Sequence, residues 1–205
     1  MPVRRCVGAL LAGGAATRMG GVPKGLELVG GRRLVDRAAE ALRHAADDVV
    51  IVANDPQAPA WLPGAAVVAD VRPGLGALGG IHAALTAAAG ADVLVLPWDA
   101  AFVPASLLRA VRDAGALDDA DVAAPRSRSP WGFEPLCAWY AASALAHVTA
   151  LLDAGDGRAG ALAARCRHLV VDASSWGDPD DIFLNVNTPA DLDRARAIAA
   201  RLDAS

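Results

Sequence analysis

A glycine-rich segment from Leu11 to Lys24, LAGGAATRMGGVPK, contains the residues best suited to binding phosphate. Its glycines allow backbone N–H groups to approach phosphate oxygens, and the cations of Arg18 and Lys24 can neutralise them. Lys24 is the single lysine among the 19 basic residues of the chain. A lone lysine among arginines indicates a position where a compact ammonium group is needed and a planar guanidinium does not fit. The segment is not a Walker loop, because Gly25 and not Ser or Thr follows the lysine. We predict a triphosphate clamp here, with a surface loop of no function as the alternative.

Three further polar residues follow apolar runs of the sequence, namely Asn54, Asp70 and Asp99. A carboxylate directly after a buried strand is well placed to hold Mg²⁺, which accepts one or two carboxylates and keeps several waters. An Asp in front of a helix is also a common N-cap, and Asn and Asp are common in turns. From the residues alone, the metal and cap interpretations of Asp99 are equally good. Asn54 and Asp70 stay open between a turn and a ligand contact.

Short apolar runs alternate with helical patterns, which is typical of a mostly parallel sheet covered by helices. We expect strands at 6–11, 49–53, 66–69, 93–96, 122–124 and 136–140, and helices at 33–46, 80–89, 104–111, 141–152 and 188–202. Pro104 is expected in the first turn of its helix. Ligands of open α/β sheets bind beyond the carboxyl ends of the strands, where the polar residues above would gather. The expected fold is one three-layer α/β/α domain over 1–205 with a mostly parallel, Rossmann-like sheet.

The composition narrows the classes of partner. The chain has 205 residues, of which 54% are hydrophobic and 20% charged, with a net charge of -4. This balance excludes general disorder and gives no electrostatic case for binding nucleic acid or an anionic membrane. The three cysteines lack metal-ligand spacing, and no apolar run is long enough to span a membrane. We therefore expect a cytoplasmic protein with no nucleic-acid or membrane partner. We also expect a monomer, although no feature of the sequence determines the oligomeric state.

Five motifs in register resemble one family. The glycine-rich segment is similar to the LAGGxSxRMGxDK signature of the molybdenum cofactor guanylyltransferases. GALGGI at 76–81 resembles their GPLGGI, and PWDAAFVP at 97–104 resembles PCDxPFxP. EPL at 134–136 stands where the family usually has His- or Gln-Pro-Leu, and NVNTP at 185–189 resembles NINTP. Together the motifs cover about residues 8 to 192.

The resemblance implies the fold of the nucleotide-diphospho-sugar transferases. It also implies transfer of GMP from GTP to the phosphate of molybdenum-molybdopterin, with release of pyrophosphate and with Mg²⁺ as cofactor. By the same resemblance the catalytic residues are Arg18, Lys24 and Asp99, and Asp99 binds the metal. The implied nucleotide contacts are Leu11, Ala12, Gly13, Gly14, Lys24, Asn54, Asp70, Gly79, Asp99 and Asn187.

The chain departs from the family pattern at Pro23, Trp98, Ala101 and Glu134, where the family usually has Asp, Cys, Pro and His or Gln. These departures leave the acceptor and the strictness of guanine selection open. One alternative is the same chemistry with CTP or another nucleotide, on molybdopterin or a sugar phosphate. The other is a nucleotide-binding protein without turnover that acts as a partner in molybdoenzyme maturation, and maturation proteins are possible partners of an enzyme too.

Some features fit the function less directly. Residues 74–79 match GxGxxG, but Arg72-Pro73 stand where a strand should precede a dinucleotide fingerprint. We expect this segment to bring its backbone close to the base or ribose. Trp131 and Phe133 could stack on a pterin or cover the core, and Arg158 could meet the acceptor's phosphate or cap a helix.

Overall fold

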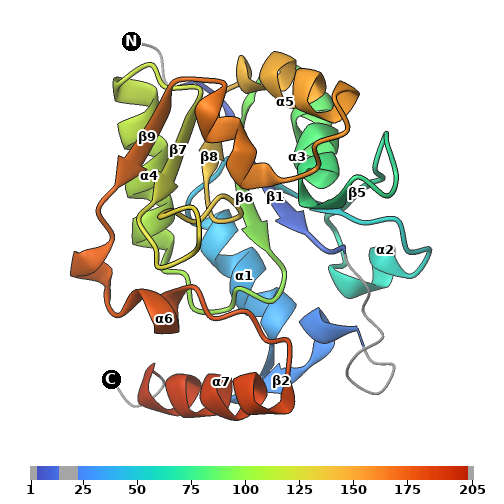
Figure 1. The fold of residues 1–205 in the computed structure, drawn as a ribbon. Helices are drawn as coiled ribbons and strands as arrows, with labels where there is room; N and C mark the ends of the chain where they lie inside the picture. The colour runs from blue at the N-terminus through green and yellow to red at the C-terminus, as the bar shows by residue number, and fades with distance from the viewer. Residues whose placement is uncertain (1–3, 14–22, 203–205) are drawn as a thin grey trace.

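A computed structural model describes residues 4–13 and 23–202 and contains a seven-stranded sheet. The sheet lies at the centre of the fold, between helices (Figure 1). The strand order is β5-β4-β1-β6-β8-β7-β9, and all neighbours are parallel except β8, which runs antiparallel to both of its neighbours. The mostly parallel sheet is therefore confirmed. The strands are β1 (Cys6–Leu11), β4 (Asp48–Val52), β5 (Ala66–Val68), β6 (Asp92–Pro97), β7 (Val122–Pro125), β8 (Trp139–Tyr140) and β9 (His168–Val171).

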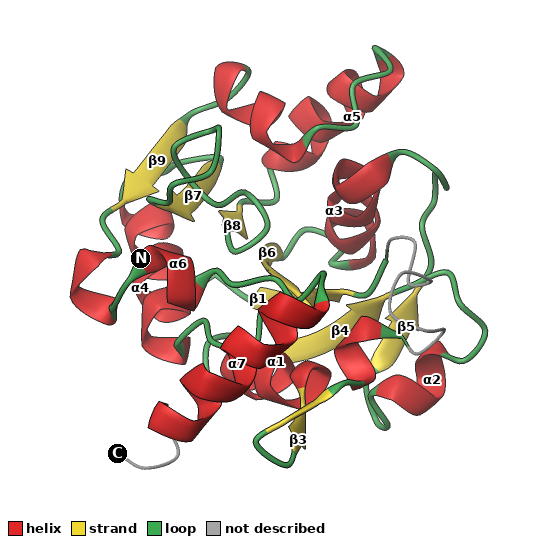
Figure 2. Cartoon of the chain, turned by 60° about the horizontal axis from the view of Figure 1, so that its bottom comes forward, coloured by secondary structure: helices red, strands yellow, loops and turns green. Residues whose placement is uncertain are grey.

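Helices cover both faces of this sheet, which gives the expected three layers (Figure 2). Alternate residues of β1 point to opposite faces, because side chains along a strand have a period of two. Cys6 and Leu10 join the core under α1 (Leu34–Arg43) and α4 (Ala105–Leu117). Val7 and Ala9 join the core under α3 (Gly76–Ala87) and α5 (Ala144–Asp153). None of the helices in the described ranges has the length and apolar run that a membrane crossing requires.

A smaller core attaches the last helix, α7 (Pro189–Leu202), to a hairpin formed by β2 (Leu28–Val29) and β3 (Arg32–Arg33). Thr188 caps this helix: its hydroxyl accepts a hydrogen bond from the backbone N–H of Asp191, at 3.1 Å. The Asp191 carboxylate in turn accepts hydrogen bonds from the backbone N–H groups of Asn187 (3.0 Å) and Thr188 (2.8 Å). The segment in front of α7 is therefore held in a fixed turn.

Several element boundaries differ from expectation. Pro104 is the N-cap of α4 and lies outside its first turn, and the helix continues beyond the expected end at 111 to Leu117. The strand expected at 136–140 is reduced to Trp139–Tyr140, because the residues before it form a turn in which the Cys137 N–H donates to the Glu134 carbonyl at 3.2 Å. The Tyr140 hydroxyl donates to the Pro135 carbonyl of this turn at 2.6 Å. The sequence patterns did not predict β2, β3, β9, α2 (Ala58–Trp61), α6 (Pro179–Ile182), η2 (Lys24–Leu26), η3 (Ala159–Ala164) or η4 (Ser174–Trp176).

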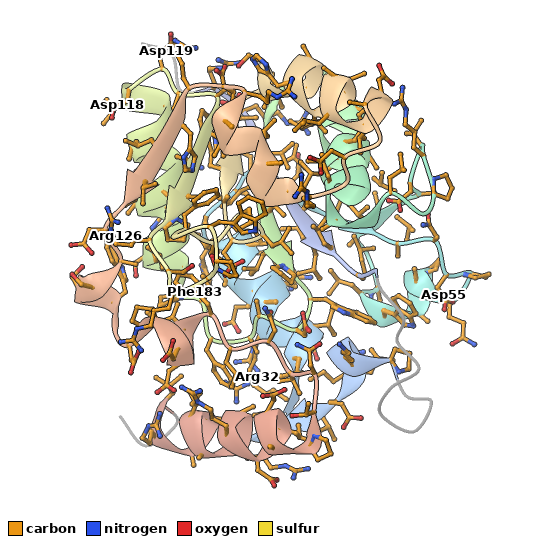
Figure 3. All side chains as sticks on the ribbon, in the orientation of Figure 1. Arg32, Asp55, Asp118, Asp119, Arg126 and Phe183 are labelled. Carbon is orange, nitrogen blue, oxygen red and sulfur yellow. The ribbon has the colours of Figure 1, made fainter. Side chains whose placement is uncertain are left out.

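At the amino edge of the sheet, the buried carboxylate of Asp121 joins three elements. It accepts hydrogen bonds from the Ser143 hydroxyl (2.6 Å) and from the backbone N–H of Arg167 (2.9 Å). The Arg167 guanidinium also pairs at 2.6 Å with Asp119. Asp119 follows the C-terminal end of α4 (Figure 3). Burial acts to raise the pKa of Asp121, but these hydrogen bonds outweigh it and hold the pKa below its ordinary value. This cluster lies at the opposite edge from the carboxyl ends of the strands and stabilises the fold.

Candidate active site

A cavity of about 700 Å³ opens beyond the carboxyl ends of β1, β4, β5 and β6. The chain leaves β1 towards β4 on one side and returns to β6 on the other, so the cavity lies at the switch point where open α/β sheets bind ligands. Its size is within the range of small-molecule sites. The lining residues are Leu11, Gly13, Lys24, Val52, Ala53, Asn54, Asp70, Gly74, Gly76, Ala77, Gly80, Pro97, Trp98, Asp99, Leu136, Asn185 and Asn187.

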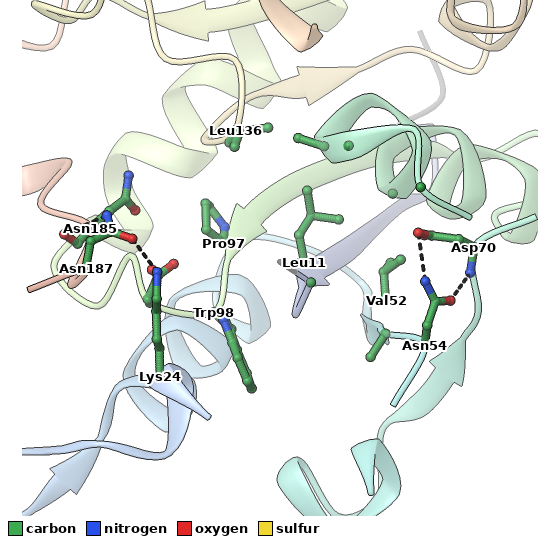
Figure 4. A pocket seen from close by; sticks show the side chains of 17 residues that line it. Leu11, Lys24, Val52, Asn54, Asp70, Pro97, Trp98, Leu136, Asn185 and Asn187 are labelled. Atoms are coloured by element: carbon green, nitrogen blue, oxygen red, sulfur yellow. Dashed lines mark hydrogen bonds between the residues drawn. The ribbon is translucent and has the colours of Figure 1, made fainter. Parts of the chain in front are cut away.

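At one end of the cavity, Asn54 and Asp70 form a reciprocal pair (Figure 4). Asn54 Nδ2 donates to Asp70 Oδ2 at 2.9 Å, and the backbone N–H of Asp70 donates to Asn54 Oδ1 at 2.8 Å. The two residues follow the adjacent strands β4 and β5, so the parallel pairing of these strands brings them together. The pair fixes the orientation of the Asp70 carboxylate at the cavity wall, where it can accept hydrogen bonds from a ligand.

The first turns of α3 form the wall next to this pair. A Cβ atom on Gly80 would lie 3.4 Å from Leu11 Cδ2 and 3.9 Å from Asp70 Oδ1, so Gly80 faces the cavity. A Cβ atom on Gly79 would instead lie 3.4 Å from both the Arg72 carbonyl and Leu75 Cβ, away from it. The structure therefore places Gly80, and not the expected Gly79, in the lining. The helix α3 begins at Gly76, inside the GxGxxG segment and four residues before the expected start at 80, and Gly74 and Gly76 also line the cavity.

At the other end, the Lys24 ammonium donates a hydrogen bond to Asn187 Oδ1 (Figure 4). Asp99 lies close enough for the positive charge of Lys24 to act on it, and only 8% of Asp99 is exposed. Burial raises the pKa of Asp99, while a hydrogen bond from its own backbone and the Lys24 charge act to lower it. Asp99 does not cap a helix, because Pro104 is the N-cap of α4. The cap interpretation of Asp99 is therefore wrong.

The end of the cavity lined by Lys24 and Asp99 offers oxygen ligands of the kind that Mg²⁺ prefers. Within residues 4–13 and 23–202, no three His, Cys, Asp or Glu side chains are grouped so that they could hold a metal by themselves. The Asp99 carboxylate is joined in the lining by Asn185, whose buried Oδ1 has no hydrogen-bond partner among the described residues. One carboxylate and an unpaired amide oxygen fit an ion that takes its remaining ligands from phosphate and water.

Two of the predicted site residues, Gly14 and Arg18, lie outside the described residues. Ala12 is buried, with its N–H on the Val52 carbonyl at 2.9 Å, and does not line the cavity. Of the remaining predicted contacts, those that line it are Leu11, Gly13, Lys24, Asn54, Asp70, Asp99 and Asn187.

The weaker candidates do not line the cavity. Phe133 is buried against the His168 ring, with ring centroids 4.2 Å apart, and the Trp131 indole covers Gly160. Arg158 pairs with Asp156 at 2.8 Å. These contacts favour the interpretation that the loop around Trp131 and Phe133 covers the core.

Sequence reasoning assigned no role in the site to Val52, Ala53, Gly80, Pro97, Trp98 and Leu136, and it included Asn185 only through the resemblance of the NVNTP motif. A signal for Asn185 was present, because the chain contains only three asparagines and all three line this cavity together with the only lysine. In a chain rich in alanine, a rare amide is a useful marker of a site.

Known proteins are similar over nearly the whole chain. The family model described as MobA-like NTP transferase domain matches residues 8–171. A molybdenum cofactor guanylyltransferase of Cereibacter sphaeroides is 40% identical over 199 residues, which covers 95% of this chain and 97% of that protein. The one of Desulfosudis oleivorans is 32% identical over 194 residues, covering 93% and 94%.

A solved structure has the same fold. The molybdopterin-guanine dinucleotide biosynthesis protein A of Archaeoglobus fulgidus superposes with a TM-score of 0.79 at 26% identity, covering 95% of this chain and 99% of that one. With the cavity at the switch point of the sheet and similarity over nearly its full length, the chain belongs to the molybdenum cofactor guanylyltransferase family of MobA-like NTP transferases.

Proposed function

We propose that this protein transfers GMP from GTP to the phosphate of molybdenum-molybdopterin and releases pyrophosphate. The observation that carries the proposal is the division of one cavity into two chemically different ends. The Asn54–Asp70 pair and small residues of α3 form one end, and Lys24 and Asp99 meet at the other. A nucleoside triphosphate also has two chemically different ends, a flat polar base at one and a strongly anionic phosphate chain at the other.

We assign the guanosine to the end formed by Asn54, Asp70 and Gly80. Guanine carries N–H donors at N1 and N2, which need acceptors such as a carboxylate or a backbone carbonyl. The Asp70 carboxylate is held in place by Asn54, and carbonyls of residues 11–13 lie at the end of the neighbouring strand β1. The absence of a side chain on Gly80 leaves room for the nucleoside against the helix.

We assign the triphosphate to Lys24 and to Arg18, which lies outside the described residues. Asp99, with the amide oxygen of Asn185, would hold Mg²⁺. When bound there, the ion supplies positive charge to the phosphate oxygens. The acceptor's phosphate is already ionised, so it can attack the α-phosphorus in line without a general base. The contribution of the chain is then the positioning of two phosphate groups and the neutralisation of their charge.

The test compares nucleotides on wild-type protein. Calorimetry with magnesium should show GTP binding, with ATP and CTP discriminated on the order of 10⁴-fold, because a wrong base leaves buried polar groups unpaired. With GTP, magnesium and molybdenum-molybdopterin, the protein should release pyrophosphate. CTP or ATP binding as tight as that of GTP refutes the guanine assignment. GTP binding without pyrophosphate release supports a nucleotide-binding maturation partner and not an enzyme.

A further inference from the structure

The indole of Trp98 lies directly on the backbone of Gly25. A Cβ atom on Gly25 would lie 2.4 Å from both Cδ2 and Cε3 of the indole, so only glycine fits here without displacing the ring. Trp98 also packs against Trp61 of α2, with ring centroids 4.9 Å apart. With these contacts only 4% of Trp98 is exposed, and its ring is not available to stack on a ligand. Trp98 stands where the family signature has Cys, and a cysteine has no ring that could lie on Gly25.

The contact joins the two residues assigned to the phosphate end through their direct neighbours in sequence. Gly25 follows Lys24, and Trp98 precedes Asp99. Lys24 and Gly25 belong to the 3-10 turn η2, which is closed by hydrogen bonds from Leu26 N–H to the Pro23 carbonyl (2.9 Å) and from Glu27 N–H to the Lys24 carbonyl (3.0 Å). Because the turn is closed, placing Gly25 on the indole also fixes where the Lys24 side chain begins.

The position of Trp98 is itself fixed by the sheet. Its backbone N–H donates to the Leu11 carbonyl at 3.1 Å, which continues the pairing of β6 with β1. Lys24 is therefore held at both ends, by the indole beneath its turn and by Asn187 at its ammonium group. A lysine has a long flexible stem with many rotamers, so this restraint matters for how often the ammonium meets the phosphates.

We propose that Trp98 and Gly25 form a positioning pair that holds Lys24 next to Asp99 for binding of the triphosphate. Neither residue of the pair needs to contact the substrate, because the pair acts through Lys24. The inference rests on the proposed function only in assigning the triphosphate to Lys24. The competing explanation is that the contact stabilises the core and nothing more, as a similar contact does elsewhere: a Cβ atom on Gly115 would lie 2.4 Å from the Trp139 indole, in the core between α4 and the sheet.

The experiment is a double-mutant cycle on nucleotide binding, measured by calorimetry with the full chain and no acceptor. The variants are Gly25→Ala, Lys24→Ala and the two combined, with Gly115→Ala as the matched control. We expect Gly25→Ala to weaken GTP binding at least tenfold and to leave GMP binding within twofold, because GMP lacks the β- and γ-phosphates. In the Lys24→Ala background, Gly25→Ala should change GTP binding less than twofold. Gly115→Ala should lower the melting temperature and leave GTP binding of the folded protein unchanged.

A second pair of variants covers the case in which Gly25→Ala does not fold. Trp98→Ala removes the surface under the turn, and Trp98→Phe keeps an aromatic ring there. GTP affinity should fall in the first and be largely restored in the second. Additive losses in the cycle, equal losses for GTP and GMP, or unchanged GTP affinity in Gly25→Ala would each overturn the positioning role. Failure of wild type to release pyrophosphate would refute the proposed function, but it would leave this binding cycle intact.

Discussion

The change Gly80→Ala separates stability from binding, because it should raise one and lower the other. Gly80 lies inside α3 without a positive φ, and its added methyl would meet Leu11 Cδ2 at 3.4 Å, an ordinary contact. Glycine inside a helix is about 0.5–1 kcal/mol less favourable than alanine. For a protein of this size that gain should raise the melting temperature by about 1–4 °C. The empty protein therefore has room for the methyl group.

The nucleotide would not have the same room. The methyl would lie between Leu11, Val52 and Asp70, at the end of the cavity assigned to guanosine. Overpacking of a close contact typically costs about 1–3 kcal/mol, which corresponds to a roughly 5- to 150-fold weaker complex. Gly79→Ala is the matched control, because its methyl would point to Arg72 and Leu75 on the other side of the same helix turn. Thermal melts and GTP calorimetry on both variants measure the two effects separately.

Three results would contradict this reasoning. Unchanged GTP affinity in Gly80→Ala would mean that the nucleoside does not lie against α3. A larger loss of affinity in Gly79→Ala than in Gly80→Ala would mean that the helix presents its other face to the ligand. A fall in the melting temperature of Gly80→Ala would show that the cavity wall is more closely packed than the contact distances indicate.

The other predictions concern charged groups. Lys24→Ala should weaken GTP binding. Lys24→Arg should also be impaired, because the planar guanidinium of arginine has a different geometry from the lysine ammonium. Full activity of the Arg variant would contradict this. Asp99→Asn should reduce pyrophosphate release at least a hundredfold, because the charge that would hold the metal is lost. Its melting temperature should be kept or raised, because a buried carboxylate is removed. Unchanged turnover would place the metal elsewhere. Asp121→Asn should lower the free energy of unfolding at pH 7 by about 1–3 kcal/mol, through weaker hydrogen bonds. Because the folded-state pKa of Asp121 is lowered, its contribution is present above its ordinary pKa of 3.8 and lost as the pH falls through the lower folded value. Urea unfolding should therefore show a smaller difference in the free energy of unfolding between wild type and Asp121→Asn at pH 3 than at pH 7. An equal difference at the two pH values would contradict a lowered pKa of Asp121.

Much of the site could be predicted because parallel strands end at a common edge. The apolar runs before Leu11, Asn54, Asp70 and Asp99 form β1, β4, β5 and β6, and their carboxyl ends surround one cavity. That argument needs only the strand directions, not the side-chain positions. Cytoplasmic location, a monomeric state and maturation partners stay predictions.

The face of α3 could not be predicted in the same way. Residues 78–85 of this helix are all buried, so its sequence has no polar side from which to infer orientation. With GALGGI apolar all round, nothing in the pattern distinguishes Gly79 from Gly80. The contact between Gly25 and Trp98 was also beyond sequence reasoning, because it joins two segments more than 70 residues apart and depends on packing shape.

The hydrogen bond between Lys24 and Asn187 has a consequence for how the protein is made. These residues are 163 positions apart, so the phosphate end is closed only when a late part of the chain joins an early one. During synthesis, the strands β1, β4 and β6 can pair long before residue 187 has been translated. A nucleotide stabilises only a chain that can bind it, so GTP should stabilise the finished protein more than a nascent or shortened one that stops before this residue. Cellular GTP would then protect completed molecules selectively from degradation.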